Sequence, residues 1–358
     1  MSVTLSVATS ADGYIDDLTP NRLVLSTPED WEEVYALRAQ ADAILIGAET
    51  LRRDNPTLRL KRTELMEWRE SAGLSAEPAR VIVSGRGEIS PDLRIFSEGE
   101  GRIIIFSNIS RPELTKAEVI VAQDINAAYI VTELEKMGIV ELFVEGGAKI
   151  LDMFTSQGIV DKLRLARNRK IIVGEPSAPH FTLPDWIAEA PGFCENLGGM
   201  DVQTYEVSDT DELRDEEFMD LAISVSRQSP PSPSCYRVGA VIVTESGEVF
   251  DGYTLETSPT HHAEQAAMTK AKEAGADLRG ATIYASMEPC SQRKSEPLSC
   301  SQLIMNHGFN RVVFALYEPS HFVNCQGAYN LRKAGIEVKY MPHYAKKVRK
   351  INAHVLEG

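Results

Sequence analysis

A histidine and two cysteines in the last third of the sequence have the residue types and the order of a metal site. His262 precedes Glu264 by two positions, and Cys290 and Cys300 follow further along the chain. One imidazole and two thiolates suit a catalytic zinc, because such a site uses three protein ligands and leaves a fourth position for water. Zinc lowers the pKa of that water, and a nearby carboxylate can carry the released proton to a leaving group. We therefore expect His262, Cys290 and Cys300 as zinc ligands and Glu264 as the catalytic acid and base.

The expected secondary structure would bring these residues together. His262 opens a predicted helix, Cys290 ends a predicted strand and Cys300 begins the next helix. Thiolates are favoured near the positive N-terminal end of a helix, which suits a metal ligand at Cys300. A His-x-Glu followed by Pro-Cys and a second cysteine is the signature of zinc-dependent base deaminases. The chemistry predicted for this part of the chain is hydrolytic removal of an amino group from a small amino-pyrimidine.

The sequence around this motif alternates helices and strands, which predicts an α/β domain. The helix expected over 212–227 places four apolar residues on one face, namely Phe218, Leu221, Ala222 and Val225. A turn at Ser246-Gly247 predicts a hairpin. The other elements expected here are strands over 238–244, 248–253, 281–286 and 311–316, and helices over 262–274 and 300–307.

Glycines in the first half of the chain follow predicted strands, where they let a ligand approach the backbone. Gly47 follows a strand over 43–46, and Gly146 and Gly147 follow a strand over 141–144. A glycine between a strand and a helix brings the helix N-terminus close to a bound phosphate. The sequence lacks the G-x-G-x-x-G fingerprint of one common dinucleotide site. The other elements expected here are strands over 3–8, 81–84 and 103–106, and helices over 28–39, 126–137 and 148–157.

Composition and charge favour an enzyme with small-molecule partners. The chain has 358 residues and a net charge of -15, and its length suits two domains at roughly 150 residues each. Nucleic-acid affinity comes largely from basic residues that neutralise phosphates, so this acidic balance disfavours DNA or RNA. The sequence shows no disulfide framework, signal peptide or membrane-spanning run, so we expect a cytoplasmic protein without a membrane partner. The polar stretch 204–212 indicates a boundary between two domains.

Residues 262–338 resemble the deaminase of the bifunctional riboflavin-biosynthesis deaminase–reductases. The matching segments are HAE at 262–264, GATIY at 280–284, MEPCS at 287–291, RVV at 311–313 and AGIEV at 334–338. The spacing between Cys290 and Cys300 is longer than the Pro-Cys-x-x-Cys of cytidine deaminases, and it is similar to the fungal form of the enzyme. The segment SPSCYRVG at 232–239 departs from the bacterial pattern, because it lacks the asparagine that holds the substrate there.

Most of residues 1–175 resembles the reductase of the same pathway, which has a dihydrofolate-reductase-like fold. The matching segments are ATSADGYI at 8–15, DAILIGAETL at 42–51, DNPTL at 54–58, VEGGA at 144–148 and GIVD at 158–161. The resemblance implies that Asp54 and Glu145 face the ribose of the substrate. It also implies NADPH as the hydride donor, in a site lined by Gly47, Thr50, Ser84, Gly146 and Gly147.

Three basic residues shortly after Asp54 form a candidate phosphate site. Arg59, Lys61 and Arg62 suit the 5′-phosphate of a substrate, because their cationic groups donate charge-assisted hydrogen bonds. A solvated charged face explains the same cluster equally well. The bacterial reductases have a lysine where this chain has Ser6, which leaves the proton donor of the reduction unassigned.

Together the two halves predict one enzyme with two activities. Residues 1–208 are expected to form the NADPH-dependent ribosyl-pyrimidine reductase domain, with the dihydrofolate-reductase-like fold. Residues 209–358 are expected to form the zinc-dependent pyrimidine deaminase domain, with a cytidine-deaminase-like α/β/α fold. The resemblance implies a phosphorylated ribosylaminopyrimidine as substrate and a homodimer as the assembly. Bacterial fusions place the deaminase first, so the order of the domains is reversed here.

Two alternatives stay open at this point. The altered segment 232–239 is compatible with a deaminase–reductase that acts on another amino-pyrimidine or nucleoside in a specialised pathway. A nucleic-acid-editing or non-catalytic descendant is the second alternative, and the acidic charge speaks against it. The fungal-like spacing of the cysteines also raises the hypothesis that the ribose is reduced before the ring is deaminated.

Overall fold

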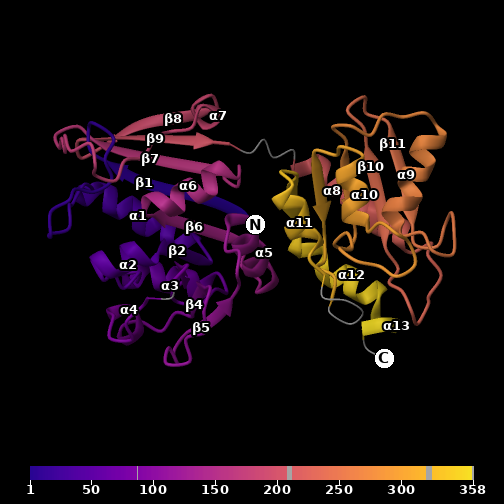
Figure 1. Cartoon of the computed structure of the whole chain (residues 1–358), viewed down its shortest axis with the longest axis horizontal. Coiled ribbons are helices and arrows are strands. Elements are labelled where there is room, and N and C mark those ends of the chain that lie inside the picture. Colours follow the sequence, from indigo (N-terminus) through magenta and orange to yellow (C-terminus); the bar gives the residue numbers. More distant parts are fainter. Residues whose placement is uncertain (87, 208–211, 320–324, 357–358) are drawn as a thin grey trace. The chain divides into compact units, whose positions relative to one another are not determined.

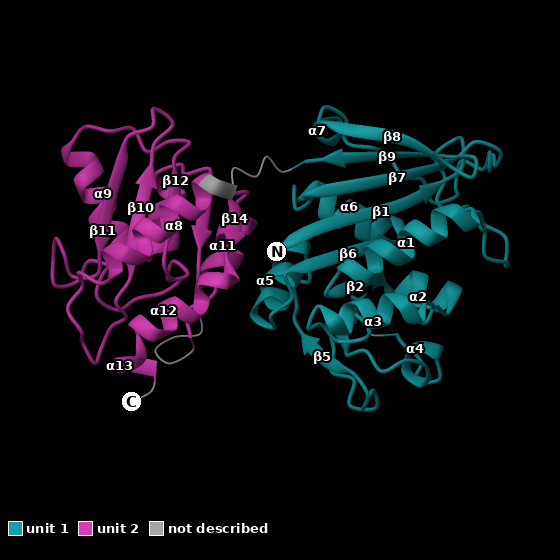
Figure 2. Ribbon diagram, turned by 180° about the vertical axis from the view of Figure 1, so that it is seen from behind, with its two compact units in different colours: residues 1–209 teal, residues 210–358 magenta. Residues whose placement is uncertain are grey.

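The computed structural model describes residues 1–86, 88–207, 212–319 and 325–356. The chain folds as two compact units, residues 1–209 and 210–358 (Figure 1, Figure 2). The domain boundary expected at 208/209 lies outside the described residues. None of the described helices combines the length and the apolar character needed to cross a membrane.

Unit 1 is built on a mostly parallel sheet of nine strands. They are β1 (Ser2–Thr9), β2 (Ala43–Gly47), β3 (Ala79–Ser84), β4 (Ile103–Ser107), β5 (Glu118–Val121), β6 (Glu141–Gly146), β7 (Lys162–Asn168), β8 (Gly192–Leu197) and β9 (Met200–Glu206). Along the sheet they follow the order β5-β4-β3-β2-β6-β1-β7-β9-β8. All neighbours from β5 to β7 are parallel, whereas β9 is antiparallel to both β7 and β8.

Helices cover both faces of this sheet. They are α1 (Pro28–Gln40), α2 (Ala48–Asp54), α3 (Thr63–Ser71), α4 (Arg94–Ser97), α5 (Ala127–Lys136), α6 (Ala148–Ser156) and α7 (Asp185–Ala188). On one face, α5 and α6 pack on strand residues that include Leu5 and Leu45. On the other face, α2 and α4 pack on Ile44 and Ile82, and α1 packs on Phe143. Burial of the strands on both faces explains why they are continuous apolar runs in the sequence.

The strand order creates a switch point in the middle of this sheet. Strand β6 lies between β1 and β2, although it comes after β5 in the sequence. The chain leaves β1 towards β2 and the strands on one side, and it leaves β6 towards β7 on the other side. In open α/β sheets a ligand binds outside the carboxyl ends of the strands at such a point.

Unit 2 is a smaller α/β/α sandwich. Its strands are β10 (Gly239–Val243), β11 (Val249–Tyr253), β12 (Thr282–Ala285), β13 (Arg311–Phe314) and β14 (Glu337–Tyr340), in the order β11-β10-β12-β13-β14. Its helices are α8 (Glu212–Ser226), α9 (Ala263–Glu273), α10 (Cys300–Asn306), α11 (Gly327–Lys333), the 3-10 turn η1 (Pro342–Tyr344), α12 (Ala345–Ile351) and α13 (Ala353–Leu356). Strand β10 is antiparallel to β11 and β12, whereas β12, β13 and β14 are parallel. Helices α8, α12 and α13 pack on one face, and α9, α10 and α11 pack on the other.

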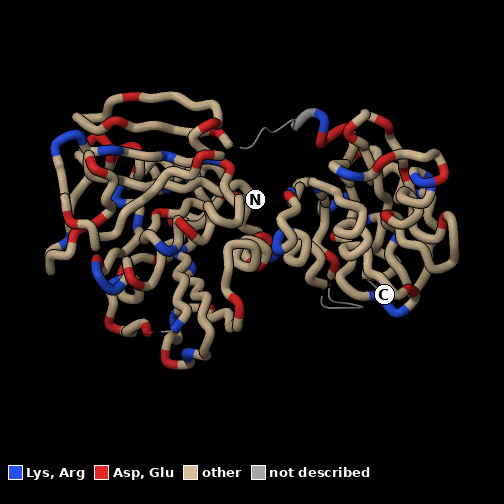
Figure 3. Tube along the Cα trace, turned by 45° about the horizontal axis from the view of Figure 1, so that its top comes forward, with Lys and Arg blue, Asp and Glu red and all other residues tan. Residues whose placement is uncertain are grey.

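Charged residues are distributed over both units. Figure 3 shows acidic and basic positions interspersed along the chain in each of them. Many form local ion pairs, such as Arg94 with Glu98 and Lys347 with Asp220. Pairs of this exposed kind contribute little to stability, so they mainly give each unit a mixed surface.

One expectation about local structure is wrong. Cys290 does not end a strand, because β12 stops at Ala285 and the cysteine lies in the loop that follows. The two units divide between 209 and 210, inside the stretch 204–212 where the boundary is expected, although β9 continues into this stretch as far as Glu206. Residues of β9 alternate between buried positions (Met200, Val202, Thr204) and partly exposed polar ones, so the strand contains no continuous apolar run.

Of the four residues predicted for the buried face of α8, Ala222 and Val225 are buried and Phe218 packs against the core, but Leu221 does not. Leu221 is 39% exposed, whereas Met219 and Ile223 are fully buried. Both buried residues belong to the cluster that α8 forms with the sheet of unit 2. Apolar residues occur on more than one side of this helix, so periodicity alone did not determine which side faces the sheet.

Candidate active sites

Unit 2 brings the three predicted metal ligands together. The ligand atoms of His262, Cys290 and Cys300 all lie within 4.8 Å of one another. The Cys300 Sγ is 3.4 Å from His262 Nδ1, and Cys290 Sγ accepts a hydrogen bond from the Cys300 backbone N–H at 3.3 Å. A tetrahedral zinc with bonds of about 2.0 to 2.3 Å holds its ligand atoms roughly 3.5 Å apart. One imidazole and two thiols at these separations fit a zinc ion.

Two helix N-termini position two of these ligands. His262 is the N-cap of α9, and Cys300 is the first residue of α10. A capping box fixes the start of α10, because Ser299 and Gln302 each accept a backbone hydrogen bond from the other. The positive ends of both helices therefore face the ligand atoms, which favours ionised thiolates there.

A buried glutamate holds the turn that leads to the first cysteine. Glu288 is 3% exposed and accepts backbone hydrogen bonds from Glu318 at 3.2 Å and Ala328 at 2.9 Å. Gly327 lies against the Pro289 carbonyl, where a Cβ would come within 1.8 Å of the oxygen. A side chain at position 327 would therefore displace the loop that carries the metal ligand.

Glu264 lies beside the ligands in the first turn of α9. It is 3% exposed, and its Oε2 accepts a hydrogen bond from the Cys300 thiol at 3.4 Å. Burial is the main cause that raises the pKa of Glu264 above the usual value of a glutamate, and the charge of His262 opposes it. A raised pKa suits a carboxyl group that must both take and give a proton near neutral pH.

The two thiols differ in their ionisation. The hydrogen bond with the Cys300 thiol, followed by the contact with His262, lowers the pKa of Cys290 to about 4. The same contact with Cys290, together with complete burial, raises the pKa of Cys300. Metal ions bind the thiolate form, so a bound zinc ion would take the place of the proton on Cys300.

The sequence motifs did not identify two charged side chains near this site. Arg293 lies in the loop between the two cysteines, and its Nε and Nη1 are buried without a hydrogen-bond partner in the described parts of the chain. Glu318 follows β13, and its Oε2 is buried and equally unpartnered there. Burial is the main cause that raises the pKa of Glu318 to about 7. The position of Arg293 between two ligands is a sequence signal, but its unpartnered state is visible only in three dimensions.

Unit 1 has a cavity of about 1150 Å³ at the carboxyl ends of its parallel strands. Residues at or near the carboxyl ends of β1, β2, β3 and β6 line it, together with parts of α2 and the start of α6. This is the position that the switch in strand order predicts for a ligand. The volume exceeds the roughly 300 to 1,000 Å³ typical of a site for one small ligand, so a cofactor and a substrate can lie side by side.

The residues predicted for the cofactor are placed at this cavity. Gly47, Thr50, Ser84 and Gly147 line it, and Gly146 precedes Gly147 at the end of β6. Gly147 has a φ of +84°, and a Cβ there would lie 2.8 Å from Thr50 Oγ1. It is also the N-cap of α6 and offers no side-chain cap, so backbone N–H groups at the start of α6 stay available to a ligand.

The residues predicted for the substrate divide into two groups. Asp54, Lys61 and Glu145 line the cavity. Arg59 and Arg62 are not among the described residues that line it, because each turns to an acidic partner. These pairs are Arg59–Glu77, with 2.8 Å between Nε and Oε1, and Arg62–Glu32. The three basic residues therefore do not act as one phosphate-binding cluster in this structure.

A buried arginine orients Glu145. Arg38 is 6% exposed and pairs with both oxygens of Glu145, with Nη2 at 2.6 Å from Oε2. Its guanidinium carbon is 5.7 Å from the centre of the Trp31 ring and 5.5 Å from that of Tyr35. Burial alone would lower the pKa of Arg38. The ion pair with Glu145 outweighs burial, and the pKa of Arg38 is raised. The carboxylate is thus held in place before any ligand binds.

A second buried ion pair lines the same cavity. Arg164 donates a hydrogen bond to Asp30 Oδ1 at 2.6 Å and another to Glu33 Oε2 at 3.0 Å. The other oxygen of Asp30 is buried without a partner in the described ranges. Arg164 and Asp30 both line the cavity, as does Ser6 on the neighbouring strand β1. The motifs did not identify either charged residue, because the pair joins α1 to β7, far apart in the sequence.

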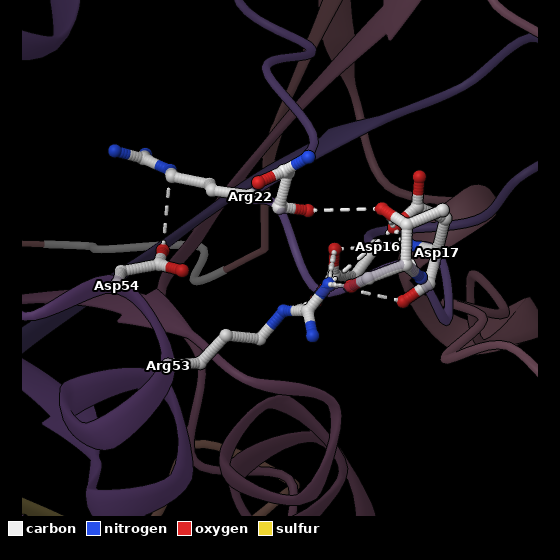
Figure 4. Close-up of polar contacts among 7 residues, drawn as sticks. Asp16, Asp17, Arg22, Arg53 and Asp54 are labelled. Carbon is white, nitrogen blue, oxygen red and sulfur yellow. Dashed lines mark hydrogen bonds and ion pairs between the residues drawn. The ribbon is translucent and has the colours of Figure 1, made fainter.

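A polar loop is tied to the end of α2 beside this cavity (Figure 4). Arg53 donates hydrogen bonds to Asp16 Oδ1 at 2.9 Å and to the Thr19 carbonyl at 3.0 Å. Asp54, the last residue of α2, pairs with Arg22 at 3.2 Å. Burial is the main cause that raises the pKa of Asp54, and the charge of Arg22 opposes it. Asp54 therefore keeps a proton to a higher pH than an exposed aspartate does.

Comparison with known proteins finds a family model that matches each unit. The RibD C-terminal domain matches residues 1–183, and the cytidine and deoxycytidylate deaminase zinc-binding region matches residues 213–316. A reductase domain followed by a zinc deaminase domain defines the class, an enzyme with two catalytic domains in one chain. The chain belongs to the RibD C-terminal domain family, and its two domains stand in reversed order relative to RibD.

Individual relatives match one unit each. The diaminohydroxyphosphoribosylamino-pyrimidine deaminase of Schizosaccharomyces pombe is 42% identical over 125 residues, which are 34% of this chain and 31% of that protein. The 2,5-diamino-6-ribosylamino-4(3H)-pyrimidinone 5′-phosphate reductase of Archaeoglobus fulgidus is 32% identical over 182 residues, which are 49% of this chain and 83% of that protein. A solved deaminase–reductase structure from Thermotoga maritima is 23% identical, with a TM-score of 0.46 over 57% of this chain and 56% of that chain.

These relatives bear on the alternatives that the sequence left open. The chain spans about a third of the length of the S. pombe deaminase and most of the A. fulgidus reductase. Both units are homologous to deaminases and reductases of riboflavin biosynthesis, so a separate specialised pathway is not favoured.

Proposed function

We propose that this chain catalyses two steps of riboflavin biosynthesis on a phosphorylated ribosylaminopyrimidine. Unit 2 deaminates the ring with a zinc ion, and unit 1 reduces the ribosyl group to a ribityl group with NADPH. The observation that carries the proposal is the convergence of His262, Cys290 and Cys300 beside the buried Glu264. The cavity at the switch point of unit 1 supports the second activity.

For deamination, the side chains of unit 2 divide the work between metal binding and proton transfer. His262, Cys290 and Cys300 would hold the zinc ion, and its chemistry when bound would be to activate water for attack on a ring carbon. Glu264 takes a proton from the attacking water and passes it first to a ring nitrogen and then to the leaving amino group. The carbon–nitrogen bond to that group breaks, and the products are ammonia and a ring carbonyl. Burial of Glu264 keeps bulk water from competing for the proton.

For reduction, unit 1 binds a cofactor and a substrate in one cavity. Backbone at Gly146 and Gly147 approaches the cofactor, because neither residue has a side chain to keep it away. NADPH, when bound here, would supply the hydride for C1′ of the opened ribosylamine. Glu145, held by Arg38, and Asp54 face the ribose, and Lys61, one of several cations that line the cavity, binds the phosphate. Gly47, Thr50 and Ser84 complete the cofactor site.

We place the reduction before the deamination. The A. fulgidus relative of unit 1 is named for a substrate with both amino groups still on the ring. If unit 1 of this chain accepts the same compound, the ribityl product then passes to unit 2. Both reactions take place in a homodimer, the assembly that the family resemblance implies.

The substitution Glu264→Gln tests the deaminase. It keeps the size of the side chain and the three metal ligands but removes the proton carrier. We expect zinc content to stay at about one per chain and ammonia release to fall about 100-fold or more. Atomic absorption and an ammonia assay measure the two quantities. The matched control is Glu273→Gln at the exposed end of α9, which is expected to behave like wild type. Normal ammonia release by Glu264→Gln would contradict the assigned role.

A further inference from the structure

The loop between the two cysteines carries an arginine whose donors are not used inside the protein. Arg293 Nη2 donates to Gln265 Oε1, the residue next to Glu264 on α9. Its Nε and Nη1 are buried, and no described residue accepts a hydrogen bond from either atom. No described carboxylate forms an ion pair with this guanidinium. Buried donors without acceptors are costly, so native proteins rarely keep them unless another molecule satisfies them.

The loop is fixed so that this guanidinium stays next to the metal ligands. Thr260, two residues before His262, donates a hydrogen bond to Glu296 Oε1 at 2.6 Å. The bond from Arg293 to Gln265 forms the second tie between the loop and the segment that carries the histidine. Arg293 follows the ligand Cys290 by three residues, and its partner Gln265 follows Glu264 directly on α9. Arg293 is therefore a fixed cation at the edge of the reaction site.

Among the described residues, no acidic side chain of the site is a hydrogen-bond partner of Arg293 Nε or Nη1, so these donors stay available to a substrate. Zinc with two thiolates and a neutral imidazole carries no net charge. The glutamate in the same loop, Glu296, is engaged with Thr260. A guanidinium whose Nε and Nη1 are buried without an acceptor attracts an oxygen that carries a full or partial negative charge.

We propose that Arg293 is a substrate-positioning residue of the deaminase, and that its free N–H groups bind an oxygen acceptor of the pyrimidine substrate. This inference rests on the proposed function of unit 2. Two oxygens of such a substrate share the required chemistry: the carbonyl oxygen of the ring and an oxygen of the phosphate. Either contact orients the ring so that the carbon bearing the amino group faces the metal and Glu264.

The test compares Arg293→Gln with wild type in the zinc-loaded full chain. Ammonia release is measured on the ribityl diaminopyrimidinone phosphate and on the same compound without its phosphate. We expect the KM of Arg293→Gln for the phosphorylated compound to rise about 10- to 100-fold, the usual effect of losing a hydrogen bond to a charged partner. If the phosphate is the acceptor, the two proteins have the same KM for the dephosphorylated compound. If the ring carbonyl is the acceptor, the increase persists.

Two further variants separate positioning from folding. Lys294→Gln removes one positive charge from an exposed neighbour in the same loop and is expected to keep the wild-type KM. Arg293→Lys keeps the charge but loses the guanidinium, and it is expected to show a smaller increase in KM than Arg293→Gln. This variant also carries the test if Arg293→Gln fails to fold.

Three results would overturn the inference. One is a KM within twofold of wild type for Arg293→Gln on both compounds. Another is a loss of zinc or of thermal stability in that variant with an unchanged KM for its remaining active fraction, because Arg293 would then only support the loop. If wild type releases no ammonia from either compound, the proposed function fails and the inference with it, which distinguishes this case from the first two.

Discussion

Gly147 is the residue at which the reductase cavity leaves no room for a side chain. An alanine Cβ at this position would lie 2.8 Å from Thr50 Oγ1, and the backbone has a φ of +84°. We expect Gly147→Ala to raise the KM for NADPH about tenfold or more, because the cofactor or the start of α6 must shift. Ammonia release from the ribityl compound by the other unit should not change. Steady-state kinetics of the two activities measure both effects.

The matched control for this substitution is Gly138→Ala. Gly138 follows α5 and also has a φ of +84°, but a Cβ there meets nothing within 4 Å. The control therefore carries the backbone strain without the contact with Thr50. Equal effects of the two substitutions on the KM for NADPH would show that strain alone is responsible, and Gly147 would lose its place in the cofactor site.

Sequence reasoning identified residues with a fixed spacing but not those that depend on distant partners. His262, Cys290 and Cys300 have the order of a known chemistry, and the structure brings them within 4.8 Å. Arg59 and Arg62 looked like phosphate ligands because they follow Asp54 closely in the sequence. Each instead pairs with an acid that the local sequence does not reveal.

At the scale of elements, a buried aspartate on α8 joins the helix to three strands of unit 2. Asp215 is 1% exposed and accepts hydrogen bonds from Arg311 and Lys339, each at 2.8 Å, and from the Tyr284 hydroxyl at 3.0 Å. Removing one member of a buried ion pair leaves the others unpaired, which costs about 3 to 5 kcal/mol. We expect Asp215→Asn to lower the free energy of unfolding of unit 2 by about that amount at pH 7. Denaturant unfolding measures it.

The pH dependence gives this prediction a second test. Burial alone would raise the pKa of Asp215, but the contacts with Arg311 and Lys339 outweigh burial and hold it below the usual value. A lowered pKa in the folded state means that the carboxylate stabilises the protein above the pKa of the unfolded chain, and that this contribution disappears as the pH falls. The difference between wild type and Asp215→Asn should therefore be constant near neutral pH and shrink below about pH 4.

The control for this substitution is Asp220→Asn on the same helix. Asp220 is exposed and pairs with Lys347, so its loss should change stability by less than about 1 kcal/mol. Similar effects of the two substitutions would contradict the account of Asp215, because burial would then make no difference.

The elements that the sequence predicted are those with strong apolar periodicity or clear caps. The helix α1 begins at Pro28 as expected, because the Thr27 side chain accepts the Asp30 backbone hydrogen bond at 3.3 Å. Strand β8 was not predicted, because almost all of its residues are exposed and it has no apolar alternation. Helix α2 is too short, at 7 residues, to show a helical period. Strand β8 depends on pairing with β9, and helix α2 depends on packing against the sheet, so neither is evident from its own sequence.

At the scale of the whole molecule, each unit has its own hydrophobic core and its own candidate site. Unit 1 has its cavity at the carboxyl ends of a parallel sheet, and unit 2 has its metal site at the starts of α9 and α10. The α/β class of both units follows from the alternation of strands and helices in the sequence. The order of the strands does not follow from it, because nothing in the sequence of β6 says that it lies between β1 and β2.

The most direct test of the account follows both reactions in one sample of the full chain. Zinc-loaded protein is mixed with the ribosyl diaminopyrimidinone phosphate, with NADPH, with NADH or with neither, and cofactor oxidation and ammonia are measured together. We predict oxidation of one NADPH per substrate, an equal amount of ammonia that follows it, and little of either product without NADPH. Ammonia that appears equally fast without a cofactor would contradict the proposed order. Zinc-loaded protein that yields neither product under any of these conditions would contradict the central claim that this chain is a reductase and a deaminase of riboflavin biosynthesis.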